Sequence, residues 1–262
     1  MSDGTHPVAG CTEREVRIAV DRFAAWLERS GYSSYDPYDV WGTRYGRLAR
    51  RLFYDKRLAG AVMTAPVILM EIVCPSLRGA FVEKQRFATA EAQLALGFLN
   101  LYEAERTQGS GGEWLAKAKQ LASSLLDQSA PGYSGHCWGY PFDWQNVNGL
   151  MPKGTPHITA TPYCYEVFAR LWDLTGEEQY LEVVRSITAF VFEDLKDTPT
   201  GRDSAAASYT PHDCGKVVNA SAYRAYLLFD AARRFGRDDY REKAWKNLRF
   251  ILESQKSDGS WL

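Results

Sequence analysis

Three of the four histidines in this 262-residue chain lie in two segments that are rich in turn-forming and aromatic residues. His136 and His157 belong to segment 129–157, and His212 belongs to segment 197–216. Imidazole titrates near neutral pH, so histidine is the side chain best suited to moving protons under physiological conditions. The two segments are therefore the first place to look for chemistry.

Each segment also carries a carboxylate beside its histidines. Asp143 follows His136, and Asp213 is adjacent to His212. A histidine and a carboxylate brought together by the fold supply an acid and a base. We predict that these four residues are the catalytic candidates; the alternative is that the histidines are hydrogen-bonded structural residues and that the aspartates stabilise turns.

Aromatic and amide side chains surround these groups and suggest a ligand rich in hydroxyl groups. Aromatic faces pack against the C–H faces of sugars, and amides and carboxylates bind hydroxyls. The alternative is that the rings only plug the mouth of the fold. The predicted substrate-binding residues are Asp36, Tyr38, Asp39, Trp138, Tyr140, Trp144, Gln145, Lys153, His157, Tyr209 and Asn219.

The same segments contain residues with metal-ligand chemistry, but their spacing matches no compact zinc signature. Asp238-Asp239-x-x-Glu242 is superficially similar to a magnesium–diphosphate motif. Its position predicts instead that it complements the positive end of a helix dipole. We expect no metal and no cofactor.

Composition and charge restrict the binding partners and the cellular compartment that we expect for this protein. The net charge of −1 gives no broad field for nucleic acid, and residues 1–10 lack the pattern of a signal peptide. Five widely spaced cysteines indicate a reducing cytoplasm. The most apolar stretch, 58–74, contains Pro66 and Glu71, which predicts a buried or surface-dipping helix and not a membrane span.

Helical periodicity dominates the chain, and no convincing strand pattern appears. One all-α domain is expected over residues 1–262, with a flexible start (1–11), divergent helices (12–80) and regular hairpins (86–262). The predicted helices span 12–31, 43–55, 57–74, 86–107, 113–129, 158–175, 177–196, 217–235 and 238–256.

The sequence pattern of a helical hairpin recurs three times in the second half of the chain. Its short turns are 112–114, 176–180 and 236–240, each beginning at glycine and ending at an aromatic residue. Glycine suits the left-handed position that ends a helix, and such hairpins must stack to bury their apolar faces. The connections between hairpins are long and all enter at the same helix end, so we expect them to gather on one rim and carry the site.

The closing segment resembles the QW motif of terpenoid-cyclase-like α/α toroids. It places Gln255 before Gly259-Ser-Trp261. In that motif the glutamine caps an outer helix and the tryptophan packs on it. We therefore predict an α/α toroid of stacked hairpins.

Most of the chain resembles a bacterial family linked to exopolysaccharide biosynthesis, within the terpenoid-cyclase-like and protein-prenyltransferase-like toroid superfamily. The matching segments are 35–39, 132–145, 152–156, 209–213, 218–220 and 255–261. The family has a histidine where this chain has Val218, and its members continue beyond the QW-like segment. The resemblance thus implies an incomplete toroid of about nine helices, whose uncovered faces favour self-association over peripheral membrane contact.

These observations lead to one functional expectation with two alternatives. We expect a carbohydrate-active protein of polysaccharide or glycoconjugate biosynthesis that binds a sugar at the rim, with acid–base chemistry of the hydrolase, lyase or epimerase type. The first alternative is a non-catalytic scaffold or glycan-binding subunit. The second is a metal-dependent prenyl or terpenoid cyclase or transferase.

Overall fold

The computed structural model describes residues 12–147 and 149–261. This part of the chain has an essentially all-α fold, as predicted. Short 3₁₀ turns and one π-helical turn (Phe190–Asp194, after α7) complete the helical structure of this part. The helices are α1 (Glu13–Ser30), α2 (Arg44–Asp55), α3 (Arg57–Val73), α4 (Ala88–Glu105), α5 (Gly112–Asp127), α6 (Thr161–Thr175), α7 (Glu178–Ala189), α8 (Val218–Phe235) and α9 (Asp238–Glu253).

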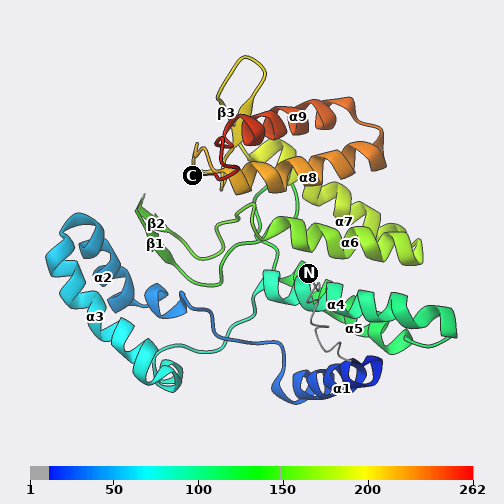
Figure 1. The fold of residues 1–262 in the computed structure, drawn as a ribbon, viewed down its shortest axis with the longest axis horizontal. Coiled ribbons are helices and arrows are strands. Elements are labelled where there is room, and N and C mark those ends of the chain that lie inside the picture. Colours follow the sequence, from blue (N-terminus) through cyan, green and yellow to red (C-terminus); the bar gives the residue numbers. More distant parts are fainter. Residues whose placement is uncertain (1–11, 148, 262) are drawn as a thin grey trace, which may run out of the picture.

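Three helical hairpins, α4–α5, α6–α7 and α8–α9, stack side by side (Figure 1). Helix α1 flanks the first hairpin, where Arg17 pairs with Glu105 and Lys117 pairs with Glu28. Helices α1 and α9 lie at opposite ends of the stack in Figure 1. The described helices therefore form an open stack, and they do not close into a ring.

The predicted repeat accounts for the core of this stack. Gly176 and Gly236 end α6 and α8 in the left-handed conformation, with φ of 67° and 64°. The aromatic residue at the start of each second helix is buried, as expected (Trp114, Tyr180 and Tyr240). Apolar side chains one and two turns later pack beneath it, because each hairpin buries its face against the next.

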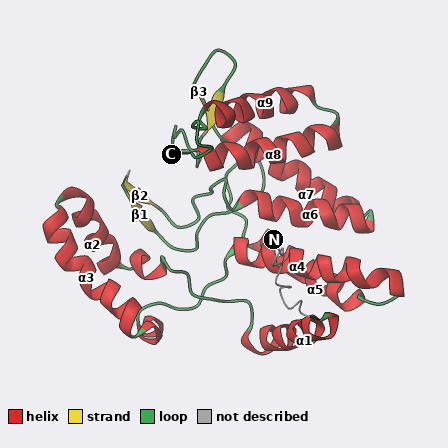
Figure 2. Ribbon diagram, in the orientation of Figure 1, coloured by secondary structure: helices red, strands yellow, loops and turns green. Residues whose placement is uncertain are grey.

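The α2–α3 hairpin lies apart from the stack (Figures 1 and 2). Helix α3 packs on α2, but its outer face is strongly exposed, with Leu58 and Ile72 among the uncovered side chains. Of the two alternatives predicted for 58–74, a buried or a surface-dipping helix, the exposed face therefore contradicts the buried one. None of the helices in the described residues is long and apolar enough to cross a bilayer.

Two small antiparallel sheets lie in the long connections, where no strand was predicted. Strands β1 (Trp144–Asn146) and β2 (Gly149–Met151) pair in one connection, and β3 (Asp197–Pro199) and β4 (Ala205–Ala207) pair in the other. Each strand has only three residues, which is too short to produce a readable alternation of apolar and polar side chains.

The end of the chain does not follow the predicted QW roles. The Gln255 amide donates to the Gly259 carbonyl, at 2.9 Å, within its own turn. It is the Trp261 indole that caps α9, by donating to the Ile251 carbonyl at 3.0 Å. The glutamine therefore shapes the turn, and the tryptophan caps the helix.

Candidate functional site

The long connections gather at one end of the helical stack, and the short turns lie at the other (Figure 1). The connections also bind each other. The amide of Ile158 donates to the Tyr209 carbonyl at 3.0 Å, and the hydroxyls of Thr159 and Tyr209 lie 2.9 Å apart. The predicted sharing of one rim by segments 129–157 and 197–216 is thus seen in the structure.

A column of aromatic rings runs through this rim with Tyr140 at its centre. Ring centroids are 4.5 Å apart for Tyr140 and His157, 5.7 Å for His157 and Tyr209, and 5.3 Å for Tyr140 and Phe142. The Trp144 ring meets Tyr140 edge-on at 5.7 Å. Burial raises the pKa of Tyr140 to about 12, so its hydroxyl is protonated and able to donate a hydrogen bond.

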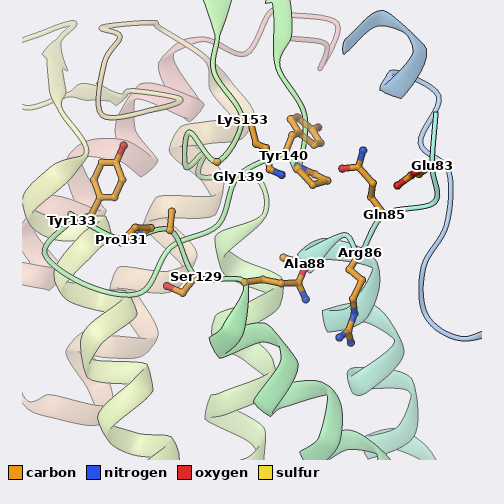
Figure 3. Close-up of a pocket in the computed structure, with 14 residues that line it drawn as sticks. Glu83, Gln85, Arg86, Ala88, Ser129, Pro131, Tyr133, Gly139, Tyr140 and Lys153 are labelled. Atoms are coloured by element: carbon orange, nitrogen blue, oxygen red, sulfur yellow. The ribbon is translucent and has the colours of Figure 1, made fainter. Parts of the chain in front are cut away.

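An open cleft of about 820 Å³, the polar cleft, lies beside this column (Figure 3). In Figure 3, Tyr140 and Lys153 form its upper wall, and the Lys153 ammonium points into it. The other lining residues come from the segment before α4 and from the connection after α5. They are Glu83, Gln85, Arg86, Ala88, Gln128, Ser129, Ala130, Pro131, Tyr133, Gly139, Pro141 and Gly154.

A fully buried carboxylate, Glu91, supports one wall of the polar cleft. It accepts two hydrogen bonds from Arg86, at 2.5 and 3.0 Å. It also accepts from the Ser124 hydroxyl at 2.6 Å and the Gln128 amide at 2.9 Å. The network holds two cleft-lining side chains, Arg86 and Gln128, in fixed positions.

Sequence reasoning missed this network, although a signal was present. Glu91 lies at helical spacing among Ala88, Ala92 and Ala95, which form the buried face of α4. A carboxylate on such a face requires charged or hydrogen-bonding partners. That requirement pointed to Arg86, the nearest cation in the sequence.

A second cleft of about 750 Å³, the apolar cleft, opens between the β1–β2 hairpin and the connection before α8. Apolar side chains dominate its walls, including Trp144, Leu150, Met151 and Val217. Five predicted residues line it, namely Trp144, Tyr209, His212, Asp213 and Asn219. A smaller cavity of about 290 Å³ lies behind the column and is lined by Asp36, Tyr140 and His157.

The predicted catalytic groups do not share one cleft. His212 and Asp213 line the apolar cleft, whereas Asp143 and His136 line neither it nor the polar cleft. Asp143 is ion-paired to Arg47 at 2.5 Å and accepts the Lys153 amide at 2.8 Å. Asp143 therefore links α2 to the segment that directly follows β2.

Asp213 organises its own loop. Its carboxylate accepts hydrogen bonds from the amides of Tyr209 (3.0 Å), Thr210 (2.6 Å) and Gly215 (2.9 Å), and from the Thr210 hydroxyl (2.7 Å). Burial alone would raise the pKa of Asp213, but these hydrogen bonds lower it overall. The structure thus supports the turn-stabilising alternative for this residue.

The two histidines bind hydroxyl groups and not carboxylates. Nδ1 of His136 lies 3.0 Å from the Ser129 hydroxyl, and burial lowers its pKa. Nε2 of His212 lies 3.3 Å from the Tyr133 hydroxyl. Ser129 and Tyr133 both line the polar cleft, so each histidine approaches that cleft only through its partner.

Several predicted binding residues are structural. Trp138 is fully buried, and its indole donates to the Leu125 carbonyl at 2.7 Å, so it is a core residue and not a stacking platform. His157 is also buried, inside the ring column. Asp39 is buried beneath its turn, where it accepts the Asp36 amide at 3.0 Å and burial raises the pKa of its carboxyl.

The remaining predicted residues are spread over the rim. Tyr38 is exposed and its ring lies 6.2 Å from that of Trp144. The Gln145 amide donates to the Asn146 carbonyl at 3.1 Å and faces a separate cleft beside α2. Of the predicted residues, only Tyr140 and Lys153 line the polar cleft.

Among the described residues, no three His, Cys, Asp or Glu side chains converge as metal ligands would. Comparison with models of known protein families finds no match, and no curated protein matches the chain in sequence. Function is therefore inferred from the geometry of the rim.

Proposed function

We propose that this protein binds a sugar in the polar cleft and serves as a glycan-binding component of polysaccharide or glycoconjugate biosynthesis. The observation that carries the proposal is the composition of the cleft. An aromatic ring, Tyr140, lies beside the amides Gln85 and Gln128 and the cations Lys153 and Arg86. This combination suits a ligand that presents C–H faces and hydroxyl groups together.

Rigidity supports the same proposal. Arg86 and Gln128 are held by the buried Glu91, and Tyr140 is held by the rings on either side of it. Binding groups that are already fixed lose little conformational entropy when the ligand arrives. The resemblance to an exopolysaccharide family points to the same class of ligand.

Binding without turnover fits the cleft better than acid–base catalysis. Glycoside hydrolysis typically uses two carboxyl groups on opposite sides of the scissile bond. Of the residues that line the polar cleft, Glu83 alone carries a carboxylate, because Glu91 is buried behind the wall and bound to Arg86. The glycan-binding alternative therefore becomes the leading proposal, and a catalytic role ranks second.

Saturation-transfer NMR with neutral and uronate-containing hexasaccharides tests this proposal. We expect millimolar or tighter binding of at least one hexasaccharide, and a loss of affinity of roughly tenfold when Lys153→Met and Gln85→Ala are combined, since both lose hydrogen bonds to the sugar. Lys216→Met, which removes another exposed lysine of the same rim, is the matched control and should bind normally.

Two outcomes would count against the proposal. Either all hexasaccharides fail to bind the folded protein, or the double variant binds as well as the Lys216 control. Release of shorter saccharides during the experiment would instead move the catalytic role to first place.

A further inference from the structure

The α2–α3 hairpin carries an apolar stripe on α3 that the other described parts of the chain leave uncovered. Leu58, Val62, Ala65, Leu69 and Ile72 are exposed and recur every three or four residues along α3, so they lie on one face of the helix, with Val73 beside Ile72. Their exposed fractions are high: Leu58 87%, Val62 75%, Leu69 61%, Ile72 74% and Val73 70%. Monomeric proteins rarely leave a contiguous apolar face of this kind open to water.

The stripe is also free of charge along most of its length. Residues 58–70 contain no charged side chain, and the only charged residue deeper in α3, Glu71, is turned toward Arg78. Helix α3 has 17 residues and is about 26 Å long. It does not meet the length and apolarity needed to cross a bilayer, but it is long enough to lie along a surface.

Positive charge borders the stripe. Segment 43–74 contains six Lys or Arg residues and two Asp or Glu residues, a net charge of +4, although the whole chain carries −1. Lys56 and Arg57 are exposed at the beginning of α3, directly before Leu58, and Arg51 is exposed one turn earlier on α2. The remainder of the chain therefore carries a net charge of −5, so the hairpin is net positive and the rest of the chain is net negative.

We propose that the α2–α3 hairpin docks this protein on an anionic lipid surface, with the α3 stripe in the interface and Arg51, Lys56 and Arg57 on the lipid headgroups. An uncharged apolar helix face bordered by basic residues is the pattern of helices that lie in a membrane interface. A second copy of the chain fits this face less well, because two hairpins of net charge +4 would be brought together.

The rim lies on the same side of the stack as this hairpin, and Arg47 of α2 is bound directly to Asp143 of the rim. A membrane beneath α3 would therefore place the rim close to lipid-attached ligands. This docking does not depend on sugar binding, and it would stand if the polar cleft bound something else.

Vesicle flotation with the full chain tests the proposal. We expect binding to phosphatidylcholine vesicles that contain phosphatidylglycerol, weaker binding to pure phosphatidylcholine, and a decline with added salt because ions screen the headgroups. Replacing Arg51, Lys56 and Arg57 by Gln should reduce binding to the anionic vesicles by about tenfold or more, and should leave binding to neutral vesicles unchanged.

The apolar contribution is tested separately by Val62→Ser, Leu69→Ser and Ile72→Ser combined. These side chains are exposed, so the substitutions should leave the fold intact and reduce vesicle binding by at least roughly tenfold. The matched control replaces three exposed apolar residues elsewhere, Val16, Val147 and Leu252, by Ser and should bind like the unmodified chain.

Amide hydrogen exchange and light scattering test the docking without relying on the variants alone. Amide hydrogen exchange of the unmodified chain should slow in 58–73 when anionic vesicles are added, whatever the variants do. The proposal is overturned if the chain fails to float with anionic vesicles. It is also overturned if light scattering shows a dimer of the 29.6 kDa chain that the Val62, Leu69 and Ile72 substitutions dissociate, since a second copy would then cover the stripe.

Discussion

His157 should make the folded protein sensitive to mild acid. Its side chain is 2% exposed, lies between the rings of Tyr140 and Tyr209, and has its Nδ1 2.9 Å from the Thr159 hydroxyl. Burial lowers the pKa of His157 to about 4, whereas an unfolded chain has a histidine pKa of about 6.5. The unfolded state therefore binds the proton more tightly than the folded state does.

The sign and size of the effect follow from this difference. Because the folded pKa is lowered, the stabilisation is complete above pH 6.5 and declines as the pH falls toward 4. At 1.36 kcal/mol for each pKa unit, the full loss is about 3 kcal/mol, of which about 2 kcal/mol is lost between pH 7 and pH 5. His136, whose pKa is also lowered by burial, adds a contribution of the same sign.

Urea unfolding at pH 7 and pH 5 measures this loss. His157→Phe keeps an aromatic ring in the column and removes the titrating group, so its free energy of unfolding should fall by about 2 kcal/mol less over this interval than that of the unmodified protein. His212→Phe is the matched control, because it makes the same replacement at an exposed histidine of the same rim. If the His157 variant loses as much stability as the unmodified chain, the reasoning is wrong.

Four further substitutions test how the structure is held together, each by urea unfolding. Gly135→Ala would place a Cβ 1.7 Å from the Ser186 carbonyl oxygen, so it should lower the free energy of unfolding by about 2 kcal/mol or more. Gly97→Ala, which has open space in α4, should raise the free energy of unfolding by up to about 1 kcal/mol. Equal effects of the two substitutions would contradict the packing. Arg224→Met removes a fully buried guanidinium that donates to the carbonyls of Val191, in the π-helical turn, and Leu195, just after it. The substitution should cost about 3 kcal/mol, and a change below about 1 kcal/mol would show that those carbonyls find other partners. Asp213→Ala should cost about 2 kcal/mol and speed amide exchange in 209–215, and unchanged exchange would contradict its role in that loop.

The helical stack could be predicted because its determinants are local. The glycine that ends a helix and the aromatic residue that opens the next lie a few residues apart, and both act on the backbone of their own hairpin. The apolar stripe of each helix follows the 3.6-residue period, so its buried face is readable directly. For α3 the same reasoning left a buried and a surface position open, because an apolar helix is buried only where another element is present to cover it.

The rim was harder to predict because its contacts join residues that are far apart in the sequence. Asp143 pairs with Arg47, 96 positions away, and Glu91 binds Ser124 and Gln128 on another helix. Residue type alone cannot distinguish a carboxylate that moves protons from one that is neutralised by an arginine. Trp138 illustrates the same limit, because a tryptophan in a loop suits a ligand or a core equally well.

The polar cleft depends on the hairpin stack itself and not on its loops alone. Glu91 lies on α4, and two of its partners, Ser124 and Gln128, belong to α5 and its C-terminal end, so the packing of one hairpin sets the position of Arg86. On the opposite wall, Lys153 is held through its amide by Asp143, which is bound to Arg47 of α2. The position of Lys153 therefore depends on the α2–α3 hairpin through Arg47 and Asp143, just as the position of Arg86 depends on the packing of α4 against α5.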